Sequence, residues 1–240
     1  MAYPERIVPD ETAHGIVAIH LKRYEFALPY CIGKKVLDAA CGVGYGSAAL
    51  ARSAARVVGA DVDAEAIEYA RERYGGPNVE FVVADLLAPP FDDASFDVVV
   101  SFETIEHLRA SDLFVRHVAR LLRDDGVFVV STPRAERTTT APDNPFHEVE
   151  FSRPDFEQLL AAHFGKVDLY GQRRRQTTRH RLAQRLDVFG LRKRFDFLRA
   201  GGKLLGTPTM AELSLDDVLI ERDGVDDATE LVAVCRGPRR

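Results

Sequence analysis

Short runs of apolar residues alternate with longer stretches of helical periodicity from Lys34 onward. The runs predict seven strands, over residues 35–40, 56–61, 79–84, 96–101, 126–131, 166–170 and 230–235. Between them, apolar positions three or four residues apart, such as Ile67 and Ala70, predict helices. Because strands that alternate with helices at this spacing form βαβ units, the pattern predicts a mostly parallel sheet with helices on both faces.

The predicted fold class is α/β: a Rossmann-like, doubly wound sheet of seven strands, mostly parallel, with the last strand antiparallel. A helical lid over residues 1–33 precedes the core over 34–172. A basic insertion over 173–229 separates that core from the final strand and tail over 230–240, and the whole forms one domain. With 240 residues, 46% of them hydrophobic and 29% charged, the chain has the length and composition of one large globular domain.

Charge is distributed unevenly along the chain. Residues 172–203 hold eleven Lys or Arg against two Asp, whereas the whole chain carries a net charge of −5. The rest of the chain is therefore acidic, which argues against nucleic-acid binding by the main body. Phe189, Leu191 and Phe195 interleave with the basic residues, as in an amphipathic helix that lies on an anionic membrane. The alternatives for residues 173–203 are RNA phosphates, an acidic patch on a partner subunit, or a solvated helix docked on the sheet.

Cysteine usage and hydropathy predict the compartment. Cys31, Cys41 and Cys235 are too few and too far apart for a disulfide framework or a CxxC zinc site. The longest apolar runs have the length of a strand, and the first residues lack the pattern of a secretory signal. We therefore expect a cytoplasmic protein, with peripheral contact at the inner membrane surface through residues 173–203.

A glycine-rich turn follows the first predicted strand. Gly42, Gly44 and Gly46 let the backbone turn sharply and approach a ligand, with N–H groups pointing outward at the start of the next helix. A dinucleotide-binding turn places its third glycine three residues after the second, so the spacing here differs.

Acidic residues stand at the ends of the first three predicted strands, at Asp38, Asp61 and Asp85. In a parallel sheet these ends meet at one edge, where ligands bind. Asp61 is placed to accept hydrogen bonds from both hydroxyls of a ribose, and Asp85 with Leu86 to meet an adenine. The alternative is that Asp61 or Asp63 only caps the helix that follows.

These segments resemble the class I S-adenosylmethionine-dependent methyltransferases, strongly so over residues 34–131. The resemblance rests on VLDAACGVGYG, VVGADVD, VVADLLAPPFDDASFDVVVS and LLRDDGVFVVSTP. It implies S-adenosylmethionine as methyl donor, with the methionine moiety on Gly42 and Gly44, the ribose on Asp61, and the adenine by Asp85 and Leu86. Further donor contacts are expected at Asp38, Tyr45, Val62 and Phe102.

Two carboxylates and an imidazole follow the fourth predicted strand, at Glu103, Glu106 and His107, and a second imidazole stands at His147. Oxygen ligands with one or two imidazoles suit Mg²⁺, Mn²⁺ or a similar ion. The pattern is similar to the metal site of the 2′-O-methyltransferases that act on the terminal ribose of small RNAs. The ExxEH part also occurs in ubiquinone-pathway O-methyltransferases. The resemblance implies four metal ligands, Glu103, Glu106, His107 and His147. Two alternatives are a general base at His107 or His147 and a purely structural role.

The expected activity is methyl transfer to oxygen, because only a hydroxyl needs a metal ion or a base to become a good nucleophile. Residues 5–27 and the stretch NPFHEVEFSRPDFEQLL are similar to bacterial methyltransferases of glycan and glycolipid pathways, which implies a sugar hydroxyl as acceptor. His20, Arg23 and Tyr24 either close over donor or substrate or take ordinary surface and core positions. Alternatives are the terminal ribose of RNA, a quinone or phenol, and a catalytically silent donor-binding regulatory subunit. A further open alternative is that the chain forms a homodimer.

Overall fold

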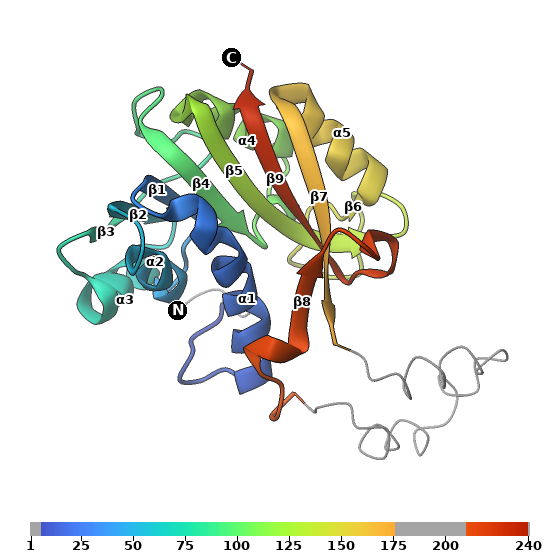
Figure 1. Cartoon of the computed structure of the whole chain (residues 1–240), viewed down its shortest axis with the longest axis horizontal. Helices are drawn as coiled ribbons and strands as arrows, with labels where there is room; N and C mark the ends of the chain where they lie inside the picture. Colours follow the sequence, from blue (N-terminus) through green and yellow to red (C-terminus); the bar gives the residue numbers. More distant parts are fainter. Residues whose placement is uncertain (1–5, 176–209, 240) are drawn as a thin grey trace, which may run out of the picture.

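The computed structural model describes residues 6–175 and 210–239, and a single mixed sheet runs through this part of the chain (Figure 1). Its strand order is β3-β2-β1-β4-β5-β9-β7-β8, and β6 pairs with β5 off this path. The strands are β1 (Lys35–Ala39), β2 (Arg56–Asp61), β3 (Val79–Val83), β4 (Phe96–Phe102), β5 (Leu122–Ala135), β6 (Phe151–Ser152), β7 (Phe164–Arg174), β8 (Val218–Glu221) and β9 (Glu230–Pro238).

Helices cover both faces of the sheet, because successive strand residues alternate between two apolar clusters. Val36 and Val129 belong to the cluster under α1, α2 and α3, whereas their neighbours Leu37 and Val130 belong to the cluster under α4 and α5. The helices are α1 (His14–Cys31), α2 (Tyr45–Ala51), α3 (Ala64–Tyr74), α4 (Ser111–Leu121) and α5 (Arg153–His163), with short 3₁₀ turns η1 (Ile105–His107), η3 (Leu215–Asp217) and η4 (Val225–Asp227).

The expected α/β topology is confirmed. Strands β1 to β5 run parallel to one another, and β9 is antiparallel to both of its neighbours, β5 and β7. All seven expected strands are present, and two short ones join them. The four residues of β8 lie inside the stretch predicted as an insertion and pair with an end of β7 that extends past Tyr170 to Arg174. Segments this short carry too little periodicity to be recognised.

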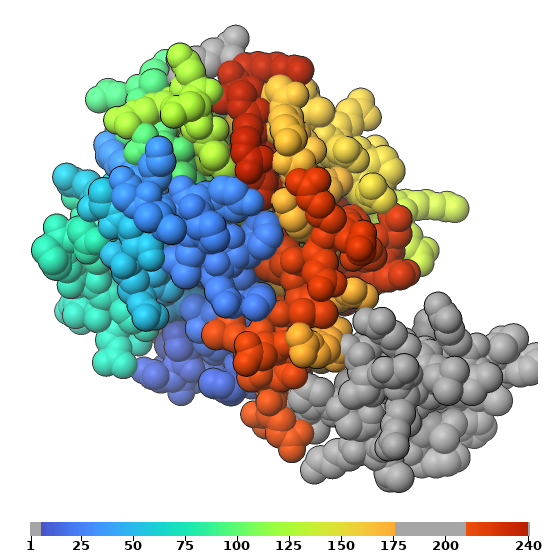
Figure 2. Space-filling view, in the orientation of Figure 1, coloured from blue at the N-terminus to red at the C-terminus, as the bar shows by residue number. Residues whose placement is uncertain are grey.

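The helix α1 lies within the stretch predicted to be helical, residues 1–33, and it packs against the sheet. Ala27 and Cys31 are fully buried among residues of β1, β4 and β9. Near its N-terminal end the backbone N–H of Gly15 donates to the carbonyl of Met210 at 2.9 Å, which brings the chain before β8 alongside the helix. Figure 2 shows these two segments, blue and orange-red, side by side on one face.

Of the basic segment over 173–203, only residues 173–175 are described; the rest of the predicted amphipathic stretch lies outside the described residues. Arg173 and Arg174 belong to β7. No helix in the described ranges is long and apolar enough to cross a membrane. Cys31, Cys41 and Cys235 are buried thiols without disulfides.

Two glycines of the turn after β1 have left-handed backbone angles, and they differ in their surroundings. Gly42 has φ +54° and open space where a Cβ would stand, whereas Gly44 has φ +87° and a Cβ there would lie 2.7 Å from both Ala70 and Phe81. Gly44 is therefore required for the close packing of the turn on α3 and β3, and Gly42 only for the turn itself.

We expect Gly42→Ala to lower the free energy of unfolding by about 1 kcal/mol, since it adds only left-handed backbone strain. Gly44→Ala should lower it by roughly 3 kcal/mol, because overpacking against Ala70 and Phe81 adds to the same strain. Urea denaturation of both variants measures the difference. Equal losses would show that the packing around Gly44 yields to an extra methyl group.

Candidate functional site

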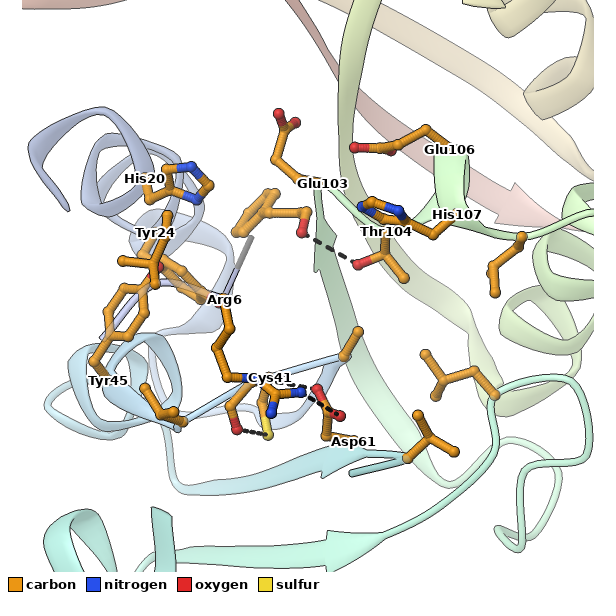
Figure 3. Close-up of a pocket in the computed structure, with 18 of the residues that line it drawn as sticks. Arg6, His20, Tyr24, Cys41, Tyr45, Asp61, Glu103, Thr104, Glu106 and His107 are labelled. Carbon is orange, nitrogen blue, oxygen red and sulfur yellow. Dashed lines mark hydrogen bonds and ion pairs between the residues drawn. The ribbon is translucent and has the colours of Figure 1, made fainter. Parts of the chain in front are cut away.

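A cavity of about 690 Å³ opens at the carboxyl ends of β1, β2, β3 and β4, the edge at which α/β sheets bind ligands (Figure 3). Its walls also include the N-terminal segment, α1 and the chain around His147. Eleven expected site residues line it: Gly42, Tyr45, Asp61, Val62, Asp85, Leu86, Phe102, Glu103, Glu106, His107 and His147. Sequence reasoning missed Arg6, Ile7, Thr12, Ile16, Ala40, Cys41, Val43, Ala84, Thr104, Leu108 and Pro133.

Asp38 and Gly44 are the two expected donor-binding residues that do not line the cavity. Asp38 is buried behind the glycine turn, where it accepts hydrogen bonds from Ser47 Oγ at 2.6 Å and from the Tyr24 hydroxyl at 3.4 Å. Burial raises the pKa of this carboxyl to about 7. The geometry thus gives Asp38 the place of a support beneath the turn.

Asp61 and Asp63 divide the roles that the sequence left open. The Asp63 carboxylate caps α3 by accepting from the backbone N–H of Glu65 at 2.9 Å and of Ala66. Asp61 instead faces the cavity, held there by the backbone N–H groups of Gly42 at 2.9 Å and Asp63 at 3.0 Å. Helix capping is therefore the function of Asp63 and leaves Asp61 available to a ligand.

Arg6 reaches both of these carboxylates. Its guanidinium makes an ion pair with Asp63 and lies 3.6 Å from the nearer oxygen of Asp61. Both side chains of the second pair are largely buried. The N-terminal pattern in residues 5–27 includes Arg6, but nothing in it indicated that this arginine reaches the carboxylates after β2.

Apolar and aromatic side chains form the rest of the donor end. Val62 is 62% exposed although it lines the cavity next to Asp61, as expected of an apolar surface that a ligand covers. Tyr24 lies edge-on against Phe102 and Tyr45, with ring centroids 4.9 and 5.9 Å away. Aromatic faces attract cations, so this group suits a positively charged sulfonium.

Glu103 directly follows β4 and has a left-handed φ of +51°, which few residues other than glycine adopt. One carboxylate oxygen accepts from Ser131 Oγ at 2.7 Å, and the other lies 3.3 Å from the guanidinium of Arg23. Arg23 is 1% exposed, so this ion pair is shielded from water on the arginine side. Both oxygens of Glu103 therefore have partners within the protein.

The structure brings together three of the four expected metal ligands. Ligand atoms of Glu106, His107 and His147 lie within 4.8 Å of one another, and Glu103 is outside this group. The two imidazole rings meet edge-on with centroids 5.0 Å apart. The carbonyl of Glu106 holds the two segments in register, because it accepts from the backbone N–H of Glu148 and of Val149. We call Glu106, His107 and His147 the acceptor triad.

Hydrogen bonds fix the proton positions of both histidines in the triad. His107 Nδ1 lies 2.8 Å from the carbonyl of Phe146, and a carbonyl only accepts, so Nδ1 carries the proton. His147 Nδ1 lies 2.9 Å from a Glu150 carboxylate oxygen, which equally requires the proton on Nδ1. In its neutral form each ring therefore has its lone pair on Nε2. At His147 this atom lies 3.0 Å from the Asn144 amide nitrogen, which donates to it.

Glu106 is the buried member of the triad, 1% exposed, and its carboxylate accepts from Thr132 Oγ1 at 3.0 Å. Desolvation, and then the nearby charge of Glu103, raise the pKa of Glu106 well above its ordinary value. A buried carboxylate stays charged only beside compensating positive charge. A buried acid grouped with two imidazoles, each ring held at Nδ1 by an outer acceptor, is the environment of a metal-binding group.

The pKa of Asp38 has a consequence for stability. From about pH 4 up to its folded pKa of about 7, the folded chain keeps a proton that the unfolded chain has released. The contribution of this group to the free energy of unfolding is therefore full below that window and is lost as pH rises through it.

As pH rises from about 4 to 7, we expect the free energy of unfolding of the wild-type protein to fall relative to that of Asp38→Asn, by on the order of a few kcal/mol. Above about pH 7 the difference between the two proteins should stay constant. The asparagine keeps the shape of the side chain and cannot ionise. Chemical denaturation at several pH values gives the comparison. Parallel profiles over the whole range would mean that Asp38 has the same pKa in the folded and the unfolded chain.

Comparison with known proteins identifies the family. A model of the methyltransferase domain matches residues 37–130. A Mycobacterium tuberculosis protein named as a probable S-adenosylmethionine-dependent methyltransferase is 33% identical over 98% of this chain and 88% of its own length. A fatty-acid O-methyltransferase of Mycolicibacterium smegmatis is 36% identical over 42% of this chain and 38% of its own.

The fold agrees with this relationship. The structure of a SAM-dependent methyltransferase from Thermotoga maritima superimposes with a TM-score of 0.63 over 92% of each chain, at 14% sequence identity. Similarity at that level of identity concerns the fold alone. The nearly full-length match at 33% identity carries the family assignment, with S-adenosylmethionine as methyl donor. The chain belongs to the S-adenosylmethionine-dependent methyltransferases.

Proposed function

We propose that this enzyme methylates a hydroxyl oxygen, foremost a sugar hydroxyl of a saccharide or glycolipid, with a divalent metal ion bound at the acceptor triad. One observation carries the proposal: both histidines of the triad are fixed with their lone pairs on Nε2, beside the buried carboxylate of Glu106. An amine acceptor would need only positioning, whereas a hydroxyl needs a group that lowers its pKa or takes its proton.

In this proposal the donor occupies the cavity from Asp61 toward Phe102. The Asp61 carboxylate accepts from the ribose hydroxyls, and the adenine lies by Val62, Asp85 and Leu86. The methionine moiety passes Gly42 and Tyr45, which directs the sulfonium to the aromatic group that includes Tyr24. The methyl group then points toward the triad. This placement is supported by the lining of the cavity and by the exposed apolar surface of Val62.

The triad fits a metal ion by its chemistry. Glu106 supplies a carboxylate oxygen, and His107 and His147 supply imidazole Nε2 atoms once the Asn144 amide turns aside. An ion there supplies Lewis acidity that lowers the pKa of a bound hydroxyl. Two imidazoles for one carboxylate shift the expected metal from Mg²⁺ toward Mn²⁺ or another transition ion. Glu103 is not included in the proposed set, because its oxygens are already bound by Ser131 and Arg23.

The reaction balances without any further reactant. The acceptor oxygen forms a bond to the methyl carbon as the carbon–sulfur bond breaks, the sulfonium becomes a neutral thioether, and the hydroxyl proton would pass to solvent when an ion holds the triad. In a metal-free enzyme His107 Nε2 is the atom that accepts this proton, because its lone pair is fixed by the bond from Nδ1 to Phe146. His147 is held in the same tautomer and is the second candidate for the general base.

The choice of a sugar rests on chemistry and on resemblance. Neighbouring sugar hydroxyls can bind one cation through two oxygens, and the sequence is similar to methyltransferases of glycan pathways. The alternatives are the terminal ribose of an RNA and a quinone or phenol. The name of the mycobacterial fatty-acid O-methyltransferase adds a carboxyl oxygen as an acceptor class. Contact of residues 173–203 with a membrane surface, a cytoplasmic location and a homodimer remain predictions.

A catalytically silent, donor-binding subunit is the alternative from another class. It would retain the donor site but have no use for the triad. Alanine at Glu106 or His107 would then leave the activity of its complex unchanged, whereas an enzyme would lose methyl transfer.

We expect one Mn²⁺ ion to bind to chelator-treated protein that is saturated with S-adenosylhomocysteine, as measured by calorimetry. His147→Ala should weaken this binding on the order of a hundredfold or more, since it removes a ligand. His163→Ala is the matched control, because that imidazole pairs with Asp112 and does not line the cavity. If neither Mn²⁺ nor Mg²⁺ binds while S-adenosylhomocysteine does, the metal proposal is wrong and His107 becomes the base.

We expect Asp61→Asn to weaken the binding of S-adenosylhomocysteine roughly ten- to a hundredfold, because hydrogen bonds to a charged acceptor are worth about 1.5–3 kcal/mol. Asp63→Asn is the control: asparagine caps a helix as well as aspartate does, so α3 is preserved and the affinity should stay within about threefold. The same titration measures both. Equal losses in the two variants would assign the effect to the shared contact with Arg6.

A further inference from the structure

His20 lines the cavity on the side of α1, and the mechanism above does not use it. Figure 3 shows it across the opening from His107, with Glu103 between them. The residue is partly buried, four positions before Tyr24 on the same helix. Its ring is therefore at the acceptor end of the cavity, opposite the triad.

A neighbouring arginine fixes the proton of His20. The Arg23 guanidinium nitrogen Nη1 lies 3.3 Å from His20 Nδ1, and arginine has only donors, so Nδ1 must hold the lone pair. The proton is then on Nε2. Among the described residues Nε2 has no hydrogen-bond partner. Burial and the charge of Arg23 lower the pKa of His20 to about 3, so the ring stays neutral at physiological pH.

Arg23 is itself held by two further partners, which keep its guanidinium beside His20. Its Nε donates to Gln172 on β7 at 2.8 Å, and its Nη2 lies 3.3 Å from Glu103. Gln172 in turn donates to the carbonyl of Ile19, one residue before His20. The helix and the imidazole are therefore anchored to the sheet through the same buried pair.

The cavity thus presents two histidines with opposite tautomers. His107 offers a lone pair on Nε2 and His20 offers an N–H on Nε2. A ligand that meets both must carry a hydroxyl at the triad, to bind the proposed ion or to give its proton to His107 in a metal-free enzyme, and an oxygen lone pair at His20. Glu103 borders the same space and is paired with Arg23, so the guanidinium beside His20 is already engaged and a neutral oxygen is favoured at His20 over an anionic one.

We propose that His20 is a specificity-determining residue, which donates from Nε2 to a second oxygen of a neutral polyol while the methylated hydroxyl meets the triad. This inference rests on the proposed function and narrows its acceptor to compounds that carry a second oxygen besides the methylated hydroxyl. None of the contacts on which it rests involves residues 173–203.

The proton position can be measured directly. The full chain, labelled with ¹⁵N-histidine and saturated with S-adenosylhomocysteine, should show one imidazole protonated on Nε2 and neutral between about pH 5 and 8. His20→Gln assigns that signal by removing it. A His20 ring protonated on Nδ1, or one that becomes charged within this range, would overturn the proposal.

Binding of a polyol is tested on the same signal. The probes are cis-1,2-cyclohexanediol, cyclohexanol as the matched single alcohol, and octanoate as a carboxylate. We expect the Nε2–H resonance to shift with the diol alone. An equal shift with cyclohexanol, or none with the diol, would overturn the role of His20. A shift with octanoate alone would replace the polyol by a carboxylic acid.

Variants separate recognition from folding. His20→Phe should weaken diol binding roughly tenfold, the value of one hydrogen bond, and His20→Gln should restore most of it because its amide nitrogen can take the place of Nε2. His14→Phe, at the exposed start of α1, should have no effect. If the metal still binds at the triad while His20→Phe and wild type bind the diol equally, this inference fails and the proposed function stands.

Discussion

The buried guanidinium of Arg23 is the interaction on which the arrangement of the cavity depends. It joins α1 to β7 through Gln172 and to the end of β4 through Glu103, and it sets the tautomer of His20. Taking one partner from a buried charged pair costs about 3–5 kcal/mol, so these elements do not separate independently. Glu103 is thereby held in a left-handed backbone conformation that places η1, and with it Glu106 and His107, at the cavity wall. The donor-side aromatic group is tied to the same helix through Tyr24.

Much of the fold could be predicted from the sequence because burial in this sheet follows a simple rule. Parallel strands covered on both faces contain continuous apolar runs, such as residues 98–100 of β4 and 127–130 of β5, and glycine and acidic residues stand near the ends of several of them. The cavity end of the sheet was therefore predictable, and so were the residues after β1, β2, β3 and β4. The short strand β8 was not, since its position depends on pairing with β7 and not on a local pattern.

The parts of the site that the sequence did not indicate depend on tertiary partners. Spacing placed Glu103 with Glu106 and His107, but spacing does not show that Arg23, eighty positions earlier, binds Glu103 in the folded chain. Likewise, two aspartates near the end of β2 were equivalent in sequence, and only the direction of α3 separates the capping residue from the one that faces the cavity. The histidine tautomers could not be predicted from the sequence either, because each depends on whether its hydrogen-bond partner in the folded chain donates or accepts.

The contact of Arg6 with Asp61 couples the two ends of the donor site. Residues 6–12 reach across the cavity to the carboxylate that the ribose is proposed to use, and Arg6 lies 3.6 Å from it. A ligand that shares this carboxylate with Arg6 changes the free energy with which the N-terminal segment docks, and the docked segment changes the affinity of the ligand by the same amount. If the donor binds Asp61 as proposed, its binding is therefore thermodynamically linked to a stretch of chain that precedes the first helix. Any substitution there that alters docking also alters the ratio of bound to free donor.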